Sequence, residues 1–67
     1  MEITLNNKIE KFEEDKLSIS DILNIKNFTF KMLIVKVNGK LIKKEEYDNT
    51  LIYNNDNIAI IHLISGG

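Results

Sequence analysis

The chain has 67 residues, no cysteine, no proline and a formal net charge of -1. A chain of this length forms one small domain, which leaves little room for a deep cleft between subdomains. Without cysteine it has no thiol nucleophile, no iron–sulfur ligands and no thiolate zinc site, so its apolar residues must supply the stability.

The charge and the N-terminus restrict the possible partners. The 9 basic and 10 acidic side chains are nearly balanced, whereas nucleic acid binding requires a basic patch or stripe. No stretch has the length of a membrane span, and residues 1–4 lack the features of a signal peptide. We therefore expect a cytoplasmic protein that binds neither nucleic acid nor membrane.

The first twelve residues predict a β-hairpin. Residues 2–6 alternate polar and apolar, which is typical of a half-buried strand with Ile3 and Leu5 pointing inward. The Asn-Asn pair at 6–7 suits a tight turn, because asparagine tolerates a positive φ. A second strand over 8–12 is expected to contain a bulge or to end early, because its apolar residues do not share one face.

A charged segment over 13–16 predicts a solvated loop before a helix. Ser18 can cap the free N–H groups of that helix, and Asp21 is favourable to the helix dipole. The apolar face of this helix consists of Ile19, Ile22 and Leu23.

A second hairpin follows in the middle of the chain. The β-rich run 33–37 is followed by Asn-Gly at 38–39 and by a further apolar run, and both positions of a type I′ turn need a positive φ. The polar segment 43–50 is expected to hold one helical turn, with Tyr47 as its anchor in the core.

The end of the chain completes the predicted fold. After an apolar contact at 51–52 and a turn at 54–57, a final strand is expected over 58–64. The element order predicts an α+β protein, with a mixed sheet of about four to five strands packed on one helix. The first and last strands can lie parallel at the centre, which is the β-grasp layout. We therefore expect a domain over 1–64 and a flexible diglycine tail over 65–67.

Little in the sequence favours conventional catalysis. His62 is the only imidazole, no nucleophile motif adjoins it, and its simplest interpretation is a histidine at the rim of the core. The acidic runs 13–15 and 45–46 are typical of solvated faces. With a single internal glycine, the chain has no phosphate-cradling loop, so we expect no catalytic residue, no metal site and no cofactor of its own.

The final strand is apolar on both sides. Alternation divides it into Ile58, Ile60 and His62 on one side and Ala59, Ile61 and Leu63 on the other. Because one helix covers only one side of a sheet, the second set predicts a partner-docking surface. The alternatives are that a loop or a second copy of the chain covers this side.

The chain ends in Ser65-Gly66-Gly67. Because diglycine lacks Cβ atoms, it can enter a narrow channel and let the terminal carboxylate reach a buried nucleotide in a partner enzyme. A frayed end without a role and a cloning remnant are the alternatives, although the final strand runs straight into the tail.

Several of these features together resemble the ThiS type of sulfur carrier, a ubiquitin-like β-grasp family of thiamine biosynthesis. The features are the hairpin at 37–39, the polar segment with Lys44 and Tyr47, the turn Asn55-Asp56 and the terminal Ser65-Gly66-Gly67. The resemblance covers nearly the whole chain. Two positions depart from it, since the family often has Gly where Asn55 stands and Pro where Lys43 stands; neither lies in the tail.

The resemblance implies a carrier that other enzymes act on, and not an enzyme. An E1-like adenylyltransferase would use ATP to adenylate the Gly67 carboxylate. Sulfur from cysteine, delivered through a cysteine desulfurase, would then displace AMP and leave a thiocarboxylate. Gly66 and Ser65 would give the tail access to the partner's channel. A thiazole synthase would take the sulfur for the thiazole ring of thiamine.

Three alternative functions share this fold. The small subunit of molybdopterin synthase has a similar tail and chemistry but tends to be longer. A ubiquitin-like modifier would share the adenylation but form isopeptide bonds to lysines. A β-grasp interaction domain with an inert tail would need no activation. The sequence leaves open the sulfur acceptor, the oligomeric state and the role of His62.

Overall fold

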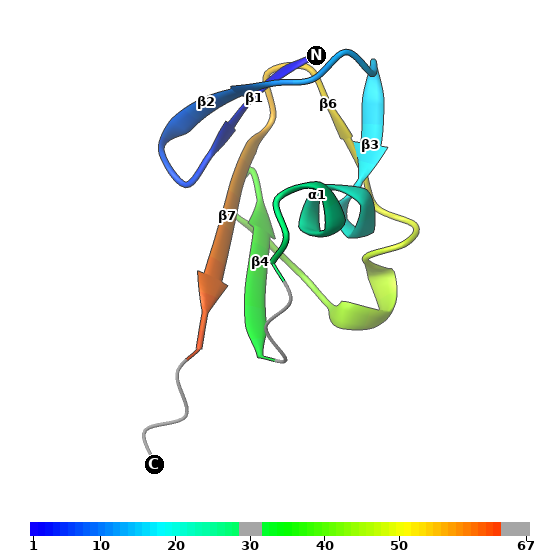
Figure 1. Cartoon of the computed structure of the whole chain (residues 1–67). Helices are drawn as coiled ribbons and strands as arrows, with labels where there is room; N and C mark the ends of the chain where they lie inside the picture. Colours follow the sequence, from blue (N-terminus) through cyan, green and yellow to red (C-terminus); the bar gives the residue numbers. More distant parts are fainter. Residues whose placement is uncertain (29–31, 64–67) are drawn as a thin grey trace.

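The computed structural model describes residues 1–28 and 32–63, and their arrangement is the predicted β-grasp (Figure 1). A five-stranded mixed sheet has the strand order β2-β1-β7-β4-β5, and one helix packs against one of its faces. The elements are β1 (Glu2–Leu5), β2 (Lys8–Lys11), β3 (Lys16–Ser18), α1 (Ile19–Ile25), β4 (Leu33–Val37), β5 (Lys40–Ile42), the 3₁₀ turn η1 (Lys44–Glu46), β6 (Leu51–Tyr53) and β7 (Asn57–His62).

The central strand of the sheet is the last strand of the chain, β7. It pairs with β1 in parallel, with Thr4 beside Asn57 and Leu5 beside Ile58. Its other edge pairs antiparallel with β4 over five register positions. The predicted parallel pairing of the first and last strands is thereby confirmed.

The N-terminal hairpin turns at two asparagines in the left-handed region. Asn6 has a φ of 51° and Asn7 a φ of 68°, as the sequence predicts. Strand β2 ends at Lys11, so the expected early end is also confirmed. Within the strand, Ile9 lies opposite Thr4 on the exposed side of the sheet, while Phe12, beyond the end of the strand, packs against the core.

A capping box fixes the start of α1. The Ser18 hydroxyl accepts a hydrogen bond from the Asp21 N–H at 3.0 Å, and the Asp21 carboxylate accepts one from the Ser18 N–H at 3.1 Å. These two bonds satisfy backbone donors that the first helical turn leaves free. The register that they set buries Ile19 and Ile22 against the sheet, and Leu23 packs beside them.

A second, two-stranded sheet was missed by the sequence reasoning. The sequence predicts a loop through residue 16 and only an apolar contact at 51–52, but β3 pairs antiparallel with β6. Leu17 and Ile52 lie opposite each other, and both are buried. Each strand has three residues, which is too short for an alternating pattern to be visible in the sequence.

The second hairpin and the segment after it follow the prediction. Asn38 and Gly39 both have positive φ, at 52° and 84°. The Asn38 side chain also holds the start of β7, since its Oδ1 accepts from the Asn57 N–H at 2.8 Å. Tyr47 follows η1 and packs against the core, and burial raises the pKa of its phenol.

The final strand is shorter than predicted. It ends at His62 and not at residue 64. The Leu63 N–H still donates to the Met32 carbonyl at 3.0 Å, so the chain continues alongside the segment before β4. Ile64 lies outside the described residues. No helix in the described part of the chain is long and apolar enough to cross a membrane.

A side-chain clasp extends the short pairing between β1 and β7. The Asn6 Oδ1 accepts a hydrogen bond from the Ile60 N–H at 2.8 Å, and the Asn6 Nδ2 donates to the Ile60 carbonyl at 3.1 Å. The Asn6 amide therefore pairs with β7 in the place where a further residue of β1 would lie.

We expect Asn6→Ala to destabilise the fold by about 1–2 kcal/mol more than Asn7→Ala, because only the first substitution removes two hydrogen bonds to β7. Both positions have positive φ, so both variants carry the same backbone penalty. Urea unfolding followed by circular dichroism measures the difference. Equal unfolding free energies for the two variants would show that the clasp contributes nothing.

Candidate functional site

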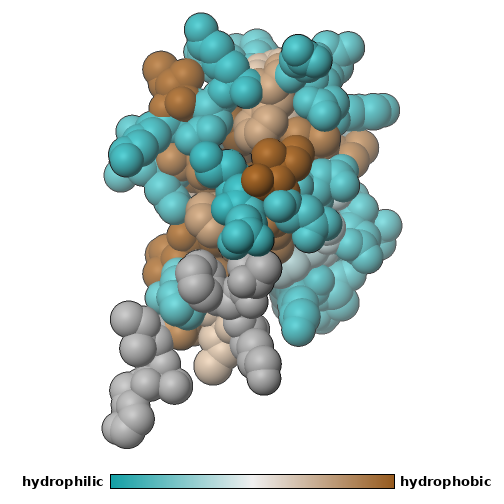
Figure 2. Space-filling view, in the orientation of Figure 1, coloured by the Kyte–Doolittle hydropathy of each residue, from teal (hydrophilic) through white to brown (hydrophobic). Residues whose placement is uncertain are grey.

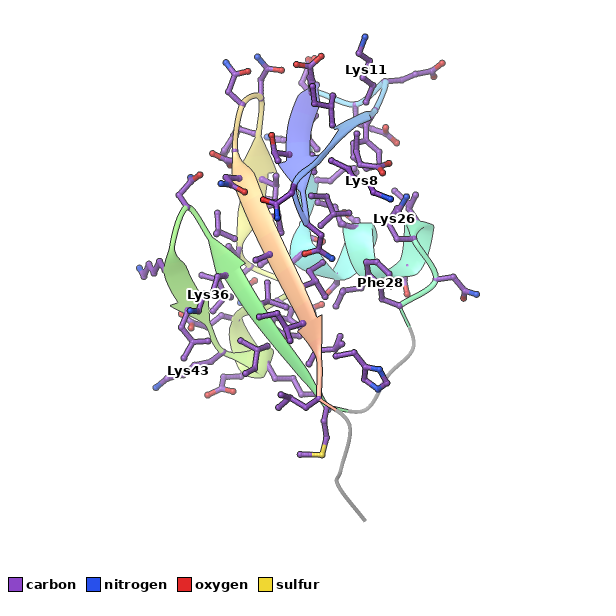
Figure 3. All side chains as sticks on the ribbon, turned by 90° about the vertical axis from the view of Figure 1, so that its left-hand side faces the viewer. Lys8, Lys11, Lys26, Phe28, Lys36 and Lys43 are labelled. Atoms are coloured by element: carbon purple, nitrogen blue, oxygen red, sulfur yellow. The ribbon has the colours of Figure 1, made fainter. Side chains whose placement is uncertain are left out.

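The side of the main sheet that faces away from α1, called here the outer face, carries the predicted docking residues. Opposite residues of an antiparallel pair point to the same side. Ile61 lies opposite Ile34, and Ala59 lies opposite Lys36, so all four belong to the outer face. In Figure 3 this face is turned toward the viewer, with α1 behind the sheet.

Six apolar side chains gather on the outer face and form a surface that we call the outer patch. Its members are Met32, Ile34, Leu41, Ala59, Ile61 and Leu63. Ile61 is 47% exposed and Leu63 39%, while Met32 and Leu41 are more than half exposed. Figure 2 shows brown apolar surface at the lower left, where β4 and β7 lie in Figure 1. Groups of exposed apolar side chains of this kind are common at interaction surfaces.

The structure thus brings together the three predicted docking residues, Ala59, Ile61 and Leu63, and adds three that the sequence reasoning missed. Alternation about the buried Val35 would have placed Ile34 on the outer face. The register of the hairpin then places Leu41 beside it. The same alternation of inner and outer side chains therefore extends from β7 to the neighbouring strands β4 and β5.

The inner side of β7 forms part of the core. Ile58 and Ile60 are buried there, as predicted. His62 lies opposite Leu33 at the end of the strand and is exposed, which fits a position at the rim. The acidic residues at 13–15 and 45–46 are exposed as well, and the described residues contain no group of three or more His, Asp or Glu side chains that could hold a metal ion.

The predicted reactive tail, Ser65, Gly66 and Gly67, lies outside the described residues. Its reach is nevertheless limited by the length of the backbone. Gly67 is four residues beyond Leu63, and a fully extended chain spans at most about 3.5 Å per residue. A reactive carboxylate at Gly67, as predicted, would therefore act at most about 14 Å from Leu63.

Comparison with known proteins decides the family. The model of the ThiS family matches residues 2–67. The chain belongs to the ThiS family. It is 34% identical over 65 residues to the sulfur carrier protein ThiS of Bacillus subtilis (strain 168), a match that covers 97% of this chain and 98% of that protein. It is also 28% identical over 58 residues to the uncharacterized protein ycf40 of Trieres chinensis, covering 87% of this chain and 80% of that one.

Solved structures of another ThiS protein confirm the fold. The crystal structure of the thiamine biosynthesis protein ThiS from Geobacter metallireducens matches with a TM-score of 0.89 at 22% identity, over all of both chains. The solution structure of a thiamine biosynthesis protein from the same organism matches with a TM-score of 0.81 at 22% identity, over all of this chain and 88% of that one. The β-grasp predicted from the element order is therefore correct.

The same substitution at two neighbouring isoleucines of β7 should change the stability by very different amounts. Ile61→Gln should change the free energy of unfolding by no more than about 1 kcal/mol, because the side chain is half exposed. Ile60→Gln should cost about 3 kcal/mol or more, because it removes buried apolar surface and buries an amide. Urea unfolding of both variants tests this. A large loss for Ile61→Gln would mean that the outer patch serves stability and is not free to bind a partner.

Proposed function

We propose that this ThiS-family chain is a sulfur carrier for thiazole formation in thiamine biosynthesis, and that partner enzymes act on it. The observation that carries the proposal is the position of β7: this strand carries Ala59 and Ile61 of the outer patch and ends at His62, five residues before Gly67 in the sequence. The relationship to the sulfur carrier protein ThiS of Bacillus subtilis, over nearly the full length of both chains, supports it.

The chemistry requires activation because a carboxylate is a poor electrophile. An E1-like adenylyltransferase would transfer AMP from ATP to the Gly67 carboxylate and release pyrophosphate. A cysteine desulfurase would take sulfur from cysteine, and a thiol reductant would release it as hydrosulfide. Attack of hydrosulfide on the acyl carbon would expel AMP and leave a thiocarboxylate. Its sulfur, like a thiolate, is a nucleophile at neutral pH.

Each part of the chain has a separate role in this proposal. Gly67 carries the reactive carbon, while Gly66 and Ser65 are narrow enough to follow it into the enzyme's channel. The outer patch would dock on the enzyme and hold the folded domain outside. The ATP would be bound by the partner, so the carrier would need no cofactor of its own. A thiazole synthase would then receive the sulfur.

The carrier chemistry predicts a mass change that can be read on the intact protein. After incubation with ATP, the adenylyltransferase and cysteine desulfurase of the same genome, cysteine and a thiol reductant, we expect the mass to rise by the difference between sulfur and oxygen. A variant that lacks Gly67 should not change, because its carboxylate no longer follows two glycines. Intact-protein mass spectrometry measures both.

The same experiment separates the competing functions. An unchanged mass, with a ThiS control protein that gains sulfur under the same conditions, would refute the carrier chemistry. Isopeptide-linked conjugates to lysines would indicate a protein modifier instead. A thiocarboxylate that supplies molybdopterin synthase, and not thiazole synthase, would retain the carrier and change the acceptor.

The outer patch should contribute directly to enzyme binding. The double variant Ile61→Gln with Leu63→Gln should bind the adenylyltransferase about tenfold more weakly or worse, since it removes two apolar contacts without adding charge. Isothermal titration calorimetry without ATP measures this affinity.

Ile9→Gln provides the matched control. Ile9 is also apolar, exposed and on the outer face, but it lies on β2 at the far edge of the sheet. Its substitution should alter the affinity by no more than about twofold, because it lies outside the outer patch. Equal losses for the control and the double variant would disprove docking through the outer patch.

A further inference from the structure

Two lysines lie on the outer face beside the outer patch. Lys36 of β4 lies between Ala59 of β7 and Leu41 of β5 in the strand register. Lys43 comes two residues after Leu41, with the extended backbone angles of φ -79° and ψ 153°, so it points to the same side of the sheet. Both lysines are exposed, and Figure 3 shows them together on the β4–β5 half of the face.

Neither lysine forms an ion pair within the described part of the chain. The ion pairs found there join Lys11 to Glu2 at 3.9 Å and Lys26 to Glu10 at 3.1 Å. The first links β2 to β1, and the second links the end of α1 to β2. The nearest acidic segment to Lys43 is η1, whose Glu46 carboxylate accepts the Lys43 backbone N–H at 3.1 Å. The outer patch therefore has a positive border on its β4–β5 side, although the whole chain has a net charge of -1.

This positive border helps to decide whether a second copy of the chain or a different protein binds the outer patch. In a symmetric dimer the same face of two copies would meet, so the Lys36 and Lys43 ammonium groups of both copies would enter one interface. Like charges within an interface oppose association, whereas carboxylates opposite the lysines favour it. The charge pattern therefore disfavours a second copy and favours a different protein with an acidic border.

We propose that Lys36 and Lys43 select a partner protein whose apolar docking surface is bordered by carboxylates, and that the E1-like adenylyltransferase has such a surface. This inference rests on the proposed function, because it names the chemistry of the enzyme that docks there. Apolar contacts with the outer patch would provide the affinity, and the lysines would fix the orientation of the domain and speed the encounter.

A pair of charge-reversal variants with equal net charge tests the proposal. Lys36→Glu with Lys43→Glu changes the border of the outer patch. Lys8→Glu with Lys16→Glu is the matched control, since these lysines are also exposed and outside any ion pair found in the described residues, but lie away from the outer face. Binding of each to the adenylyltransferase of the same genome is measured by calorimetry at low and high salt.

The border variant should bind about tenfold more weakly than the natural chain at low salt, and the difference should shrink at high salt because exposed charges are screened. The control should bind within about twofold of the natural chain. Unchanged affinity of the border variant, an equal loss in both variants, or no binding of the natural chain would each overturn the proposal. Sedimentation of the natural chain as a dimer through the outer face would also overturn it.

Failure of this inference differs visibly from failure of the proposed function. If the natural chain gains sulfur by mass spectrometry while the border variant binds with full affinity, the carrier function stands and the role of the lysines is refuted. If no sulfur is gained in the presence of an active control protein, the proposed function itself is refuted, whatever the lysine variants do.

Discussion

The structure depends most on the parallel pairing of β1 with β7, which places the last strand at the centre of the sheet. Only two register positions make this pairing, and the Asn6 amide extends it to Ile60. On its other edge, β7 pairs with β4 over its length. Because strands hold β7 on both edges, its side chains must alternate between a buried inner side and an outer face that α1 does not cover.

That central position explains how so small a domain can expose an apolar surface without losing stability. The core uses the inner side of β7 together with Ile3, Val35 and the buried face of α1, so the outer side is not needed to hold the sheet on the helix. The single apolar strand β7 thus contributes to the core with one side and to the outer patch with the other. An edge strand could not do so, because an exposed apolar edge invites pairing with other chains, and both edges here carry lysines.

The parts of the fold that could be predicted are those with a local cause. The Asn-Gly turn at 38–39 and the Ser18 capping box are set by backbone preferences within a few residues, and both were predicted. The pairing of β3 with β6 depends on segments more than thirty residues apart with three residues each, and it was missed. The site divides in the same way. Alternation along β7 gave Ala59, Ile61 and Leu63, and alternation along β4 would have given Ile34, whereas Met32 and Leu41 require the register between strands.

The short link between Leu63 and Gly67 has a consequence for the proposed carrier, which would bind two enzymes in turn. In the proposed role Gly67 would act within about 14 Å of Leu63, so any enzyme that worked on its carboxylate would have to lie against the same end of the domain. An activating enzyme and a sulfur acceptor would therefore compete for one surface and could not bind together. The order in which the two enzymes bind would then be set by the chemical state of the C-terminus. A buried site that hydrogen-bonds a carboxylate would strongly reject a thiocarboxylate, and the reverse also holds.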